Sequence, residues 1–283
     1  MRLGVHVSIG SGLGNAARRA VEIGCESVQM FSSNPSSWQV GRLDEKEAEE
    51  FKEITAQAGI SPVILHTPYL INLASQSSKG WANSWRALAS ALSRADKLGA
   101  AYVVTHIGSH GGVGIEAAGI RVRDAVMRAL DTASGDAALL LEGSAGSGNT
   151  IGASFEELAY LLNLIEDRSS RVGVCIDTAH MYGAGYDLAG ADNAAAVIAE
   201  FDRIVGLSRL GAVHLNDTQK TLASRVDRHW HIGRGNIGLE GFRALVNHPA
   251  LADKAGIIET PEMDSGFDEI NLNALKSLRK QAQ

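Results

Sequence analysis

The amino-acid sequence predicts a single-domain (β/α)8 TIM barrel, an α/β fold in which eight parallel strands alternate with helices. Short runs of apolar residues alternate along the chain with longer segments of helical spacing. The length of 283 residues matches one such barrel, and the apolar fraction of 45% with only 5 prolines indicates one packed core without linkers. We therefore expect residues 1–283 to form one domain. A doubly wound open sheet is the alternative fold.

Eight apolar runs mark the expected strands. In chain order they are LGVHVS (3–8), SVQMF (27–31), PVILHT (62–67), YVVTHIG (102–108), ALLLEG (138–143), VGVCIDT (172–178), LGAVHLND (210–217) and GIIETP (256–261). Their continuous apolar character is typical of parallel strands that are buried on both faces. Helical spacing between them predicts helices that include residues 43–59, 84–99 and 154–168. Ser154 and Glu157 are spaced as in a capping box at the start of the last of these helices.

Six of the eight expected strands end on a side chain that can bind a metal ion. These side chains are His66, His106, Glu142, Asp177, His214 and Glu259, and the adjoining loops add His180, Asp227 and His229. Because the active site of such a barrel lies at the carboxyl ends of its strands, we expect all nine to meet at one rim. His6 lies near the end of the first expected strand and is expected to support these ligands rather than to bind metal itself.

Five imidazoles and four carboxylates in one barrel mouth require bound cations, because buried like charges otherwise raise each other's pKa or separate. Nitrogen and oxygen donors without thiolate favour zinc, with manganese or iron as alternatives. Nine ligands at about three per ion predict three ions. Neighbouring metal ions of this kind are typical of phosphate-ester hydrolysis.

The formal net charge of −6 is not typical of a DNA-binding domain, which is usually basic. Three bound dications would offset this charge, so it is a poor guide to the local field. The first residues, MRLGVHVSIG, lack the pattern of a signal peptide, and no apolar segment approaches the ~18 residues of a membrane span. We expect a cytoplasmic monomer without membrane association. Cys25 and Cys175 are expected to be small core residues.

A set of motifs runs in order along nearly the whole chain. They are HTPYLINL (66–73), HIGSH (106–110), LEGSAGSG (141–148), CIDTAHMYGAGYDL (175–188), HLNDT (214–218), SRVDRH (224–229), IGRGNIG (232–238) and IET (258–260). Together they resemble the motifs of the endonuclease IV family of apurinic/apyrimidinic endonucleases (AP endonuclease family 2). CIDTAH and VDRH are the most specific of them, whereas HLND alone is a weak signal.

The resemblance implies a DNA-repair hydrolase that binds three Zn²⁺ ions and acts on double-stranded DNA containing abasic sites. It would cleave the phosphodiester 5′ to the abasic site, leaving a 3′-hydroxyl and a 5′ deoxyribose phosphate, and trimming of 3′ blocking groups is a further expected activity. By position, His66, His106 and Glu142 would hold one ion, Glu142, Asp177, His214 and Glu259 a second, and His180, Asp227 and His229 a third. Glu142 and Glu259 are also the expected catalytic residues, because they could orient the nucleophile.

The resemblance also implies contacts with distorted DNA. Tyr69 and Leu70 match a family loop that fills the gap left when a nucleotide is turned out of the duplex. Two positions depart from the family pattern. Ser36 stands where Arg is frequent, which affects the expected DNA distortion. Gly143 stands where Asn or Thr is usual, which affects the expected support for Glu142.

The loop VDRHWHIGRGNIG (226–238) combines ligands, cations and glycines. Asp227 and His229 are two residues apart, so an extended backbone would turn both toward one ion. Arg228 and Arg234 are expected to contact the DNA backbone. The glycines at 233, 235 and 238 are expected to let the main chain pass close to a phosphate strand.

Two alternative functions fit parts of this pattern. Sugar isomerases and epimerases on barrels that resemble xylose isomerase also carry Glu, Asp, His and Glu around one or two divalent ions, and fold alone does not decide function. Such an enzyme has no use for His66, His106 and His180 together with the Asp227 and His229 pair. A non-catalytic barrel that senses DNA damage would need no open coordination position.

Overall fold

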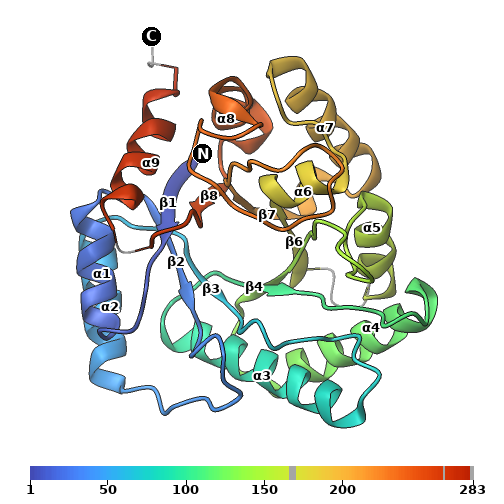
Figure 1. Ribbon diagram of the computed structural model, residues 1–283. Helices are drawn as coiled ribbons and strands as arrows, with labels where there is room; N and C mark the ends of the chain where they lie inside the picture. The colour runs from blue at the N-terminus through green and yellow to red at the C-terminus, as the bar shows by residue number, and fades with distance from the viewer. Residues whose placement is uncertain (166–169, 264, 281–283) are drawn as a thin grey trace.

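The computed structural model describes residues 1–165, 170–263 and 265–280 and is a closed barrel of eight parallel strands surrounded by helices (Figure 1). The strands pair in chain order, and β8 closes on β1. They are β1 (Arg2–His6), β2 (Ser27–Phe31), β3 (Val63–His66), β4 (Tyr102–His106), β5 (Ala138–Glu142), β6 (Val172–Asp177), β7 (Leu210–His214) and β8 (Ala255–Ile258). The predicted barrel is confirmed, and the open sheet is excluded by the pairing of β1 with β8.

Helices follow the strands and cover the outside of the barrel, except α6, which lies inside the ring of outer helices and begins directly after β6 (Figure 1). They are α1 (Leu13–Glu22), α2 (Glu45–Gln57), α3 (Ser78–Lys97), α4 (Ile115–Thr132), α5 (Phe155–Leu164), α6 (Thr178–Ala184), α7 (Ala191–Ile204), α8 (Gly238–Val246) and α9 (Gly266–Ser277), with short 3-10 turns at Leu207–Arg209 and Pro249–Leu251. Among the described residues, no helix is long and apolar enough to cross a membrane.

Capping side chains mark the starts of α3 and α5, whereas α1, α4, α7 and α8 begin without a side-chain cap. The α3 helix begins before its predicted start at residue 84, because the Ser77 hydroxyl accepts a hydrogen bond from the N–H of Gly80 and caps the helix there. At α5, Ser154 accepts from the N–H of Glu157, as predicted. The Glu157 carboxylate accepts from the N–H groups of Gly152 and Ala153, so it does not complete the capping box. Residues 166–168 of the predicted helix lie outside the described residues.

The barrel interior holds a small apolar layer that is separate from the larger layer between strands and helices. The inner layer is formed by Ile64, Val104, Leu140, Cys175, Ala212, Ala255 and Ile257. Cys175 and Cys25 are both buried, as expected from the sequence. This apolar layer closes the barrel beneath the polar side chains at its mouth.

Residues two apart in a strand point to the same face, and this spacing places the polar side chains. Each of six inner-layer residues is followed two positions later by a predicted ligand. The ligands placed in this way are His66, His106, Glu142, Asp177, His214 and Glu259. On the two remaining strands, β1 and β2, the corresponding residues are His6 and Gln29, which are paired in register. All eight strands therefore supply a polar side chain to one end of the barrel.

Candidate metal centre

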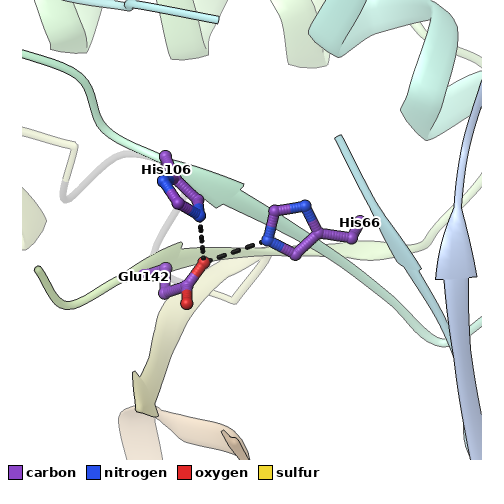
Figure 2. A group of neighbouring side chains, drawn as sticks. All are labelled: His66, His106 and Glu142. Atoms are coloured by element: carbon purple, nitrogen blue, oxygen red, sulfur yellow. Dashed lines mark hydrogen bonds and ion pairs between the residues drawn. The ribbon is translucent and has the colours of Figure 1, made fainter. Parts of the chain in front are cut away.

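The first group of side chains comes from β3, β4 and β5. Figure 2 shows the Nε2 atoms of His66 and His106 directed at one oxygen of Glu142. The distances to that Oε2 atom are 3.0 Å from His66 and 3.1 Å from His106. His66 and Glu142 are buried, whereas 39% of the His106 side chain is exposed. The group is therefore anchored in the barrel and open to solvent on one side.

The second group lies deeper and is centred on His214. Its Nδ1 atom is 3.1 Å from Oε1 of Glu142, 3.0 Å from Oε2 of Glu259 and 3.9 Å from Oδ2 of Asp177. His214 and Asp177 are completely buried. Because Oε2 of Glu142 faces the first group and Oε1 faces the second, this one carboxylate joins the two groups.

The third group joins the start of α6 to the loop after β7. The Nε2 atoms of His180 and His229 are 3.4 Å apart, and Oδ2 of Asp177 is 3.4 Å from that of His229. Oδ1 of Asp227 lies 3.1 Å from Nε2 of His180 and 3.6 Å from Nε2 of His229. The nine predicted side chains are thus brought together. The predicted division of these side chains into three ligand groups changes in one respect, because Asp177 contacts the third group as well as the second.

Hydrogen bonds to the main chain fix the direction of three imidazole rings. The Nδ1 atoms of His66, His180 and His229 lie 2.8, 2.9 and 2.9 Å from the carbonyl oxygens of Thr67, Gly143 and Glu259, respectively. Each Nδ1 must therefore carry a proton and donate it, which leaves the Nε2 lone pair directed at the centre. Two such lone pairs 3.4 Å apart, on His180 and His229, repel each other unless a cation or an added proton lies between them. The donor set therefore fits metal ions.

The electrostatics of the centre also favour positive charge. Burial alone would raise the pKa of Glu142, but the positive fields of His106 and His214 outweigh it and hold that pKa well below its usual value. Burial lowers the pKa of His180, whereas Asp177 and Asp227 raise it well above its usual value. Protons and metal ions compete for such ligands, so the field that binds protons here also suits divalent cations.

Asn216, which the sequence analysis did not single out, orients two of the carboxylates. Its Nδ2 donates to Oδ2 of Asp177 at 2.6 Å and lies 3.5 Å from Oε2 of Glu259. Its Oδ1 accepts from the N–H of Glu259 at 2.7 Å. Asn216 belongs to the HLND motif and lies two positions after His214, a buried histidine at a strand end. This spacing was the sequence signal that could have placed Asn216 beside the centre.

The glycines in the loop after β7 pack around Asp217. The N–H groups of Gly233 and Gly235 donate to its Oδ2 at 2.9 and 3.0 Å, and those of Thr218 and Ile237 donate to its Oδ1 at 2.8 and 3.0 Å. A Cβ atom at Gly235 would lie 2.4 Å from Oδ1 of Asp217. The N–H groups of Gly233 and Gly235 are therefore directed at Asp217 and not at a phosphate strand, and the close approach of this main chain to DNA stays a prediction. At these two positions glycine allows the loop to wrap a buried carboxylate.

The same loop is also held against α6, and Figure 1 shows the segment between β7 and α8 beside that helix. The N–H of Arg225 donates to the carbonyl of Gly183 at 2.8 Å, and that of Ala223 donates to the carbonyl of Tyr182 at 3.1 Å. These contacts place Asp227 beside His180, which lies on α6. The third group therefore depends on the docking of this loop.

Side chains from all three groups line a pocket of about 440 Å³, although the completely buried Asp177 and His214 are not among its lining residues. Tyr69, Arg228 and Met263 are among the residues at its wall, and Leu70 lines an adjoining pocket of about 330 Å³. Tyr69 is 61% exposed, and Leu70 is 38% exposed. An aromatic and a branched apolar side chain exposed beside a polar cleft are available for contact with a ligand.

The two positions that depart from the expected pattern have different surroundings. Ser36 is exposed, and its N–H donates to the side chain of Asn34. At Gly143, an added Cβ would lie 2.7 Å from the terminal methyl of Met181. The carbonyl of Gly143 accepts from His180, so this residue supports the third group through its main chain.

The fold and the site together define a TIM barrel with a candidate metal centre of three adjoining groups. A family model described as a xylose isomerase-like TIM barrel matches residues 17–281. A probable endonuclease 4 of Chloroflexus aurantiacus is 43% identical over 284 aligned residues, which cover 100% of this chain and 99% of that protein. The chain belongs to the endonuclease 4 family.

Solved structures agree with this assignment. The crystal structure of endonuclease IV from Thermus thermophilus superposes with a TM-score of 0.87 at 36% sequence identity, and the match covers 98% of each chain. The structure of a D-tagatose 3-epimerase-like protein superposes with a TM-score of 0.71 at 18% identity, covering 98% of this chain and 97% of the other. The second likeness shows a shared fold alone.

Proposed function

We propose that this protein is a zinc-dependent AP endonuclease of base excision repair. It hydrolyses the phosphodiester 5′ to an abasic site in double-stranded DNA and leaves a 3′-hydroxyl and a 5′ deoxyribose phosphate. The observation that carries the proposal is the set of three adjoining groups, linked by shared carboxylates, in a chain that belongs to the endonuclease 4 family. Trimming of 3′ blocking groups belongs to the same proposal, because it requires hydrolysis of the same type of ester.

The donor set supports zinc, with manganese or iron as alternatives, because it contains imidazole and carboxylate but no thiolate. The residues that would hold the ions are His66, His106, Glu142, Asp177, His180, His214, Asp227, His229 and Glu259. When bound, such ions lower the pKa of a water molecule and stabilise the charge that develops on a phosphate.

Two carboxylates of the centre, Glu142 and Glu259, are held by neighbouring side chains. Glu142 is held by three histidines from both of its oxygens, and Glu259 is held by Asn216 through main chain and side chain. Such preorganised groups cost no rearrangement during the reaction. Glu142 and Glu259 are therefore suited to orient a nucleophilic water.

Contacts to DNA are assigned to the rim of the pocket. A phosphate of straight duplex DNA would not reach a recessed centre, so the abasic nucleotide must leave the stack. Tyr69 and Leu70 are exposed beside the centre and could occupy the gap, where stacking on an aromatic ring is worth about 1–3 kcal/mol per base. Arg228 is exposed at the pocket wall and is suited to bind a backbone phosphate.

A duplex oligonucleotide with one abasic site tests the proposal. We expect the zinc-loaded protein to nick the abasic strand on the 5′ side without added magnesium and to leave the matched duplex without the lesion intact. An intact abasic duplex, together with turnover of an aldose or ketose, would favour the sugar isomerase. Tight binding of the abasic duplex without any nicking would favour a non-catalytic damage sensor.

The whole chain is proposed to act as one catalytic domain and as a monomer. All nine proposed ligands come from one barrel, so no second subunit is needed to complete the centre. Light scattering of the purified protein is expected to give a mass near 29.9 kDa. A mass near twice that value would show a dimer and contradict the proposed monomer.

A further inference from the structure

Gln29 on β2 is a buried amide that contacts two of the proposed metal ligands. Its Nε2 lies 2.7 Å from Oε1 of Glu259, and its Oε1 lies 2.9 Å from Nε2 of His214. Gln29 and His214 are completely buried. In the sequence it is a polar side chain between the apolar residues Val28 and Met30 of one strand. Burial of an amide at this position is favourable only when its polar atoms are hydrogen-bonded.

The chemistry of Glu259 decides which way round the amide lies. A carboxylate can only accept hydrogen bonds, so it must face the NH2 group of Gln29 rather than its oxygen. The amide oxygen then faces Nε2 of His214 and accepts a hydrogen bond from its N–H. Nδ1 of His6 lies 3.0 Å from the same NH2 group and 3.1 Å from Oε1 of Glu259, so a proton on this nitrogen would be donated to that carboxylate. Both polar atoms of the amide are therefore satisfied in one orientation only.

This orientation fixes the tautomer of His214. With the proton on Nε2, the Nδ1 atom carries the lone pair, and Nδ1 is the atom 3.0 Å from Glu259 and 3.1 Å from Glu142. The three histidines held by a carbonyl use the opposite nitrogen, since their Nδ1 atoms donate and their Nε2 atoms face the centre. The Gln29 amide oxygen therefore accepts the hydrogen bond from the His214 ring, as a main-chain carbonyl does for each of those three rings.

We propose that Gln29 is a positioning residue for the second group. It holds the proton of His214 on Nε2, so that Nδ1 is available as a ligand, and it holds Glu259 toward the same centre. Loss of Gln29 should lower the affinity for the ion of the second group, which Glu142, Asp177, His214 and Glu259 would hold. The affinities for the ions of the other two groups should change less. This inference rests on the proposed metal-dependent function.

The test is the zinc affinity of Gln29→Met, which has a similar volume but no hydrogen-bonding amide. We expect competition with a chelator to show one of three zinc ions bound about 10–100-fold more weakly, the usual effect of removing a partner of a metal ligand, and the other two unchanged. Ser27→Ala is the matched control, because Ser27 is buried on the same strand and its hydroxyl donates to the carbonyl of Arg2, away from the centre. If the Met variant does not fold, Gln29→Asn replaces it in the same zinc-affinity test. Its side chain is one methylene shorter, so its amide is withdrawn from His214 and Glu259.

A spectroscopic measurement separates positioning from general destabilisation. In ¹⁵N-histidine-labelled zinc-loaded protein, we expect one histidine of the wild type to carry its proton on Nε2 and bind through Nδ1, and this signal to be altered in Gln29→Met but not in Ser27→Ala. Equal zinc affinities and spectra in wild type and Gln29→Met, with a wild type that holds three ions and nicks abasic DNA, would overturn this inference alone. A wild type that binds no zinc would overturn the proposed function as well.

Discussion

Replacement of Glu142 by Gln is expected to remove two of the three metal ions and leave the third. The carboxylate contacts the first group through Oε2, at 3.0 and 3.1 Å, and the second group through Oε1, at 3.1 Å. An amide has one oxygen and one NH2 group, so it would direct N–H bonds at a nitrogen lone pair in one of the two groups. The group of Asp177, His180 and His229 does not include Glu142.

The size of the effect follows from the number of ligands that remain. The first group would keep two side chains, and the second would lose the carboxylate that joins it to the first. Loss of a partner that only supports a ligand costs about 10–100-fold in metal affinity, so loss of the ligand itself should cost at least about 100-fold in both groups. Turnover on abasic DNA should fall by at least the same factor.

The assay is zinc content after dialysis against a weak chelator, combined with the rate at which abasic DNA is nicked. Glu156→Gln is the matched control, because Glu156 is exposed in the first turn of α5 and is not part of the centre. It should keep three ions and full activity. A Glu142→Gln protein that retains three ions at the affinity of the wild type would refute the assignment of Glu142 to two groups.

Three further changes have distinct expected results. His229→Ala should lower turnover at least about 100-fold, while the Kd for abasic duplex DNA changes much less. Turnover and Kd are measured separately. An unchanged turnover would show that the loop that carries His229 takes no part in the reaction. Tyr69→Ala should raise that Kd about tenfold or more, whereas Ile120→Ala, exposed on α4, should not; equal Kd values would contradict the stacking role. Arg279 holds the pKa of Glu26 at about 2 by a hydrogen bond, so this carboxylate stabilises the fold above pH about 4.5, and the stabilisation is lost as pH falls through about 2. Glu26→Gln should therefore lower the free energy of unfolding at pH 7 by about 1–2 kcal/mol after allowance for solvent screening, with a smaller difference near pH 2.5; a difference independent of pH would contradict the pairing.

The sequence was sufficient to predict the barrel and the placement of the six proposed ligands at the strand ends, because both depend on strand periodicity. Eight apolar runs predicted eight strands, and a side chain at the end of a parallel barrel strand can point only toward the mouth or outward. His66 and Glu142 therefore had to meet once their strands were counted. Helix starts were harder to predict, since α3 begins at Ser78, after its cap Ser77, rather than at Ser84.

The residues that support the ligands were harder to predict because their role depends on contacts between distant strands. Gln29 lies 185 positions from His214 in the sequence, and its single signal was a polar side chain at an inward position of β2. The glycines at 233 and 235 were assigned to DNA contact because the sequence does not show which way their N–H groups point. The structure turns them toward Asp217, whose carboxylate needs donors once it is buried.

Elemental analysis of the protein purified without added metal tests the central proposal most directly. Three adjoining donor groups predict about three transition-metal ions per chain, with zinc as the main element. A fully active protein that contains one ion or none would contradict a centre built from all nine side chains.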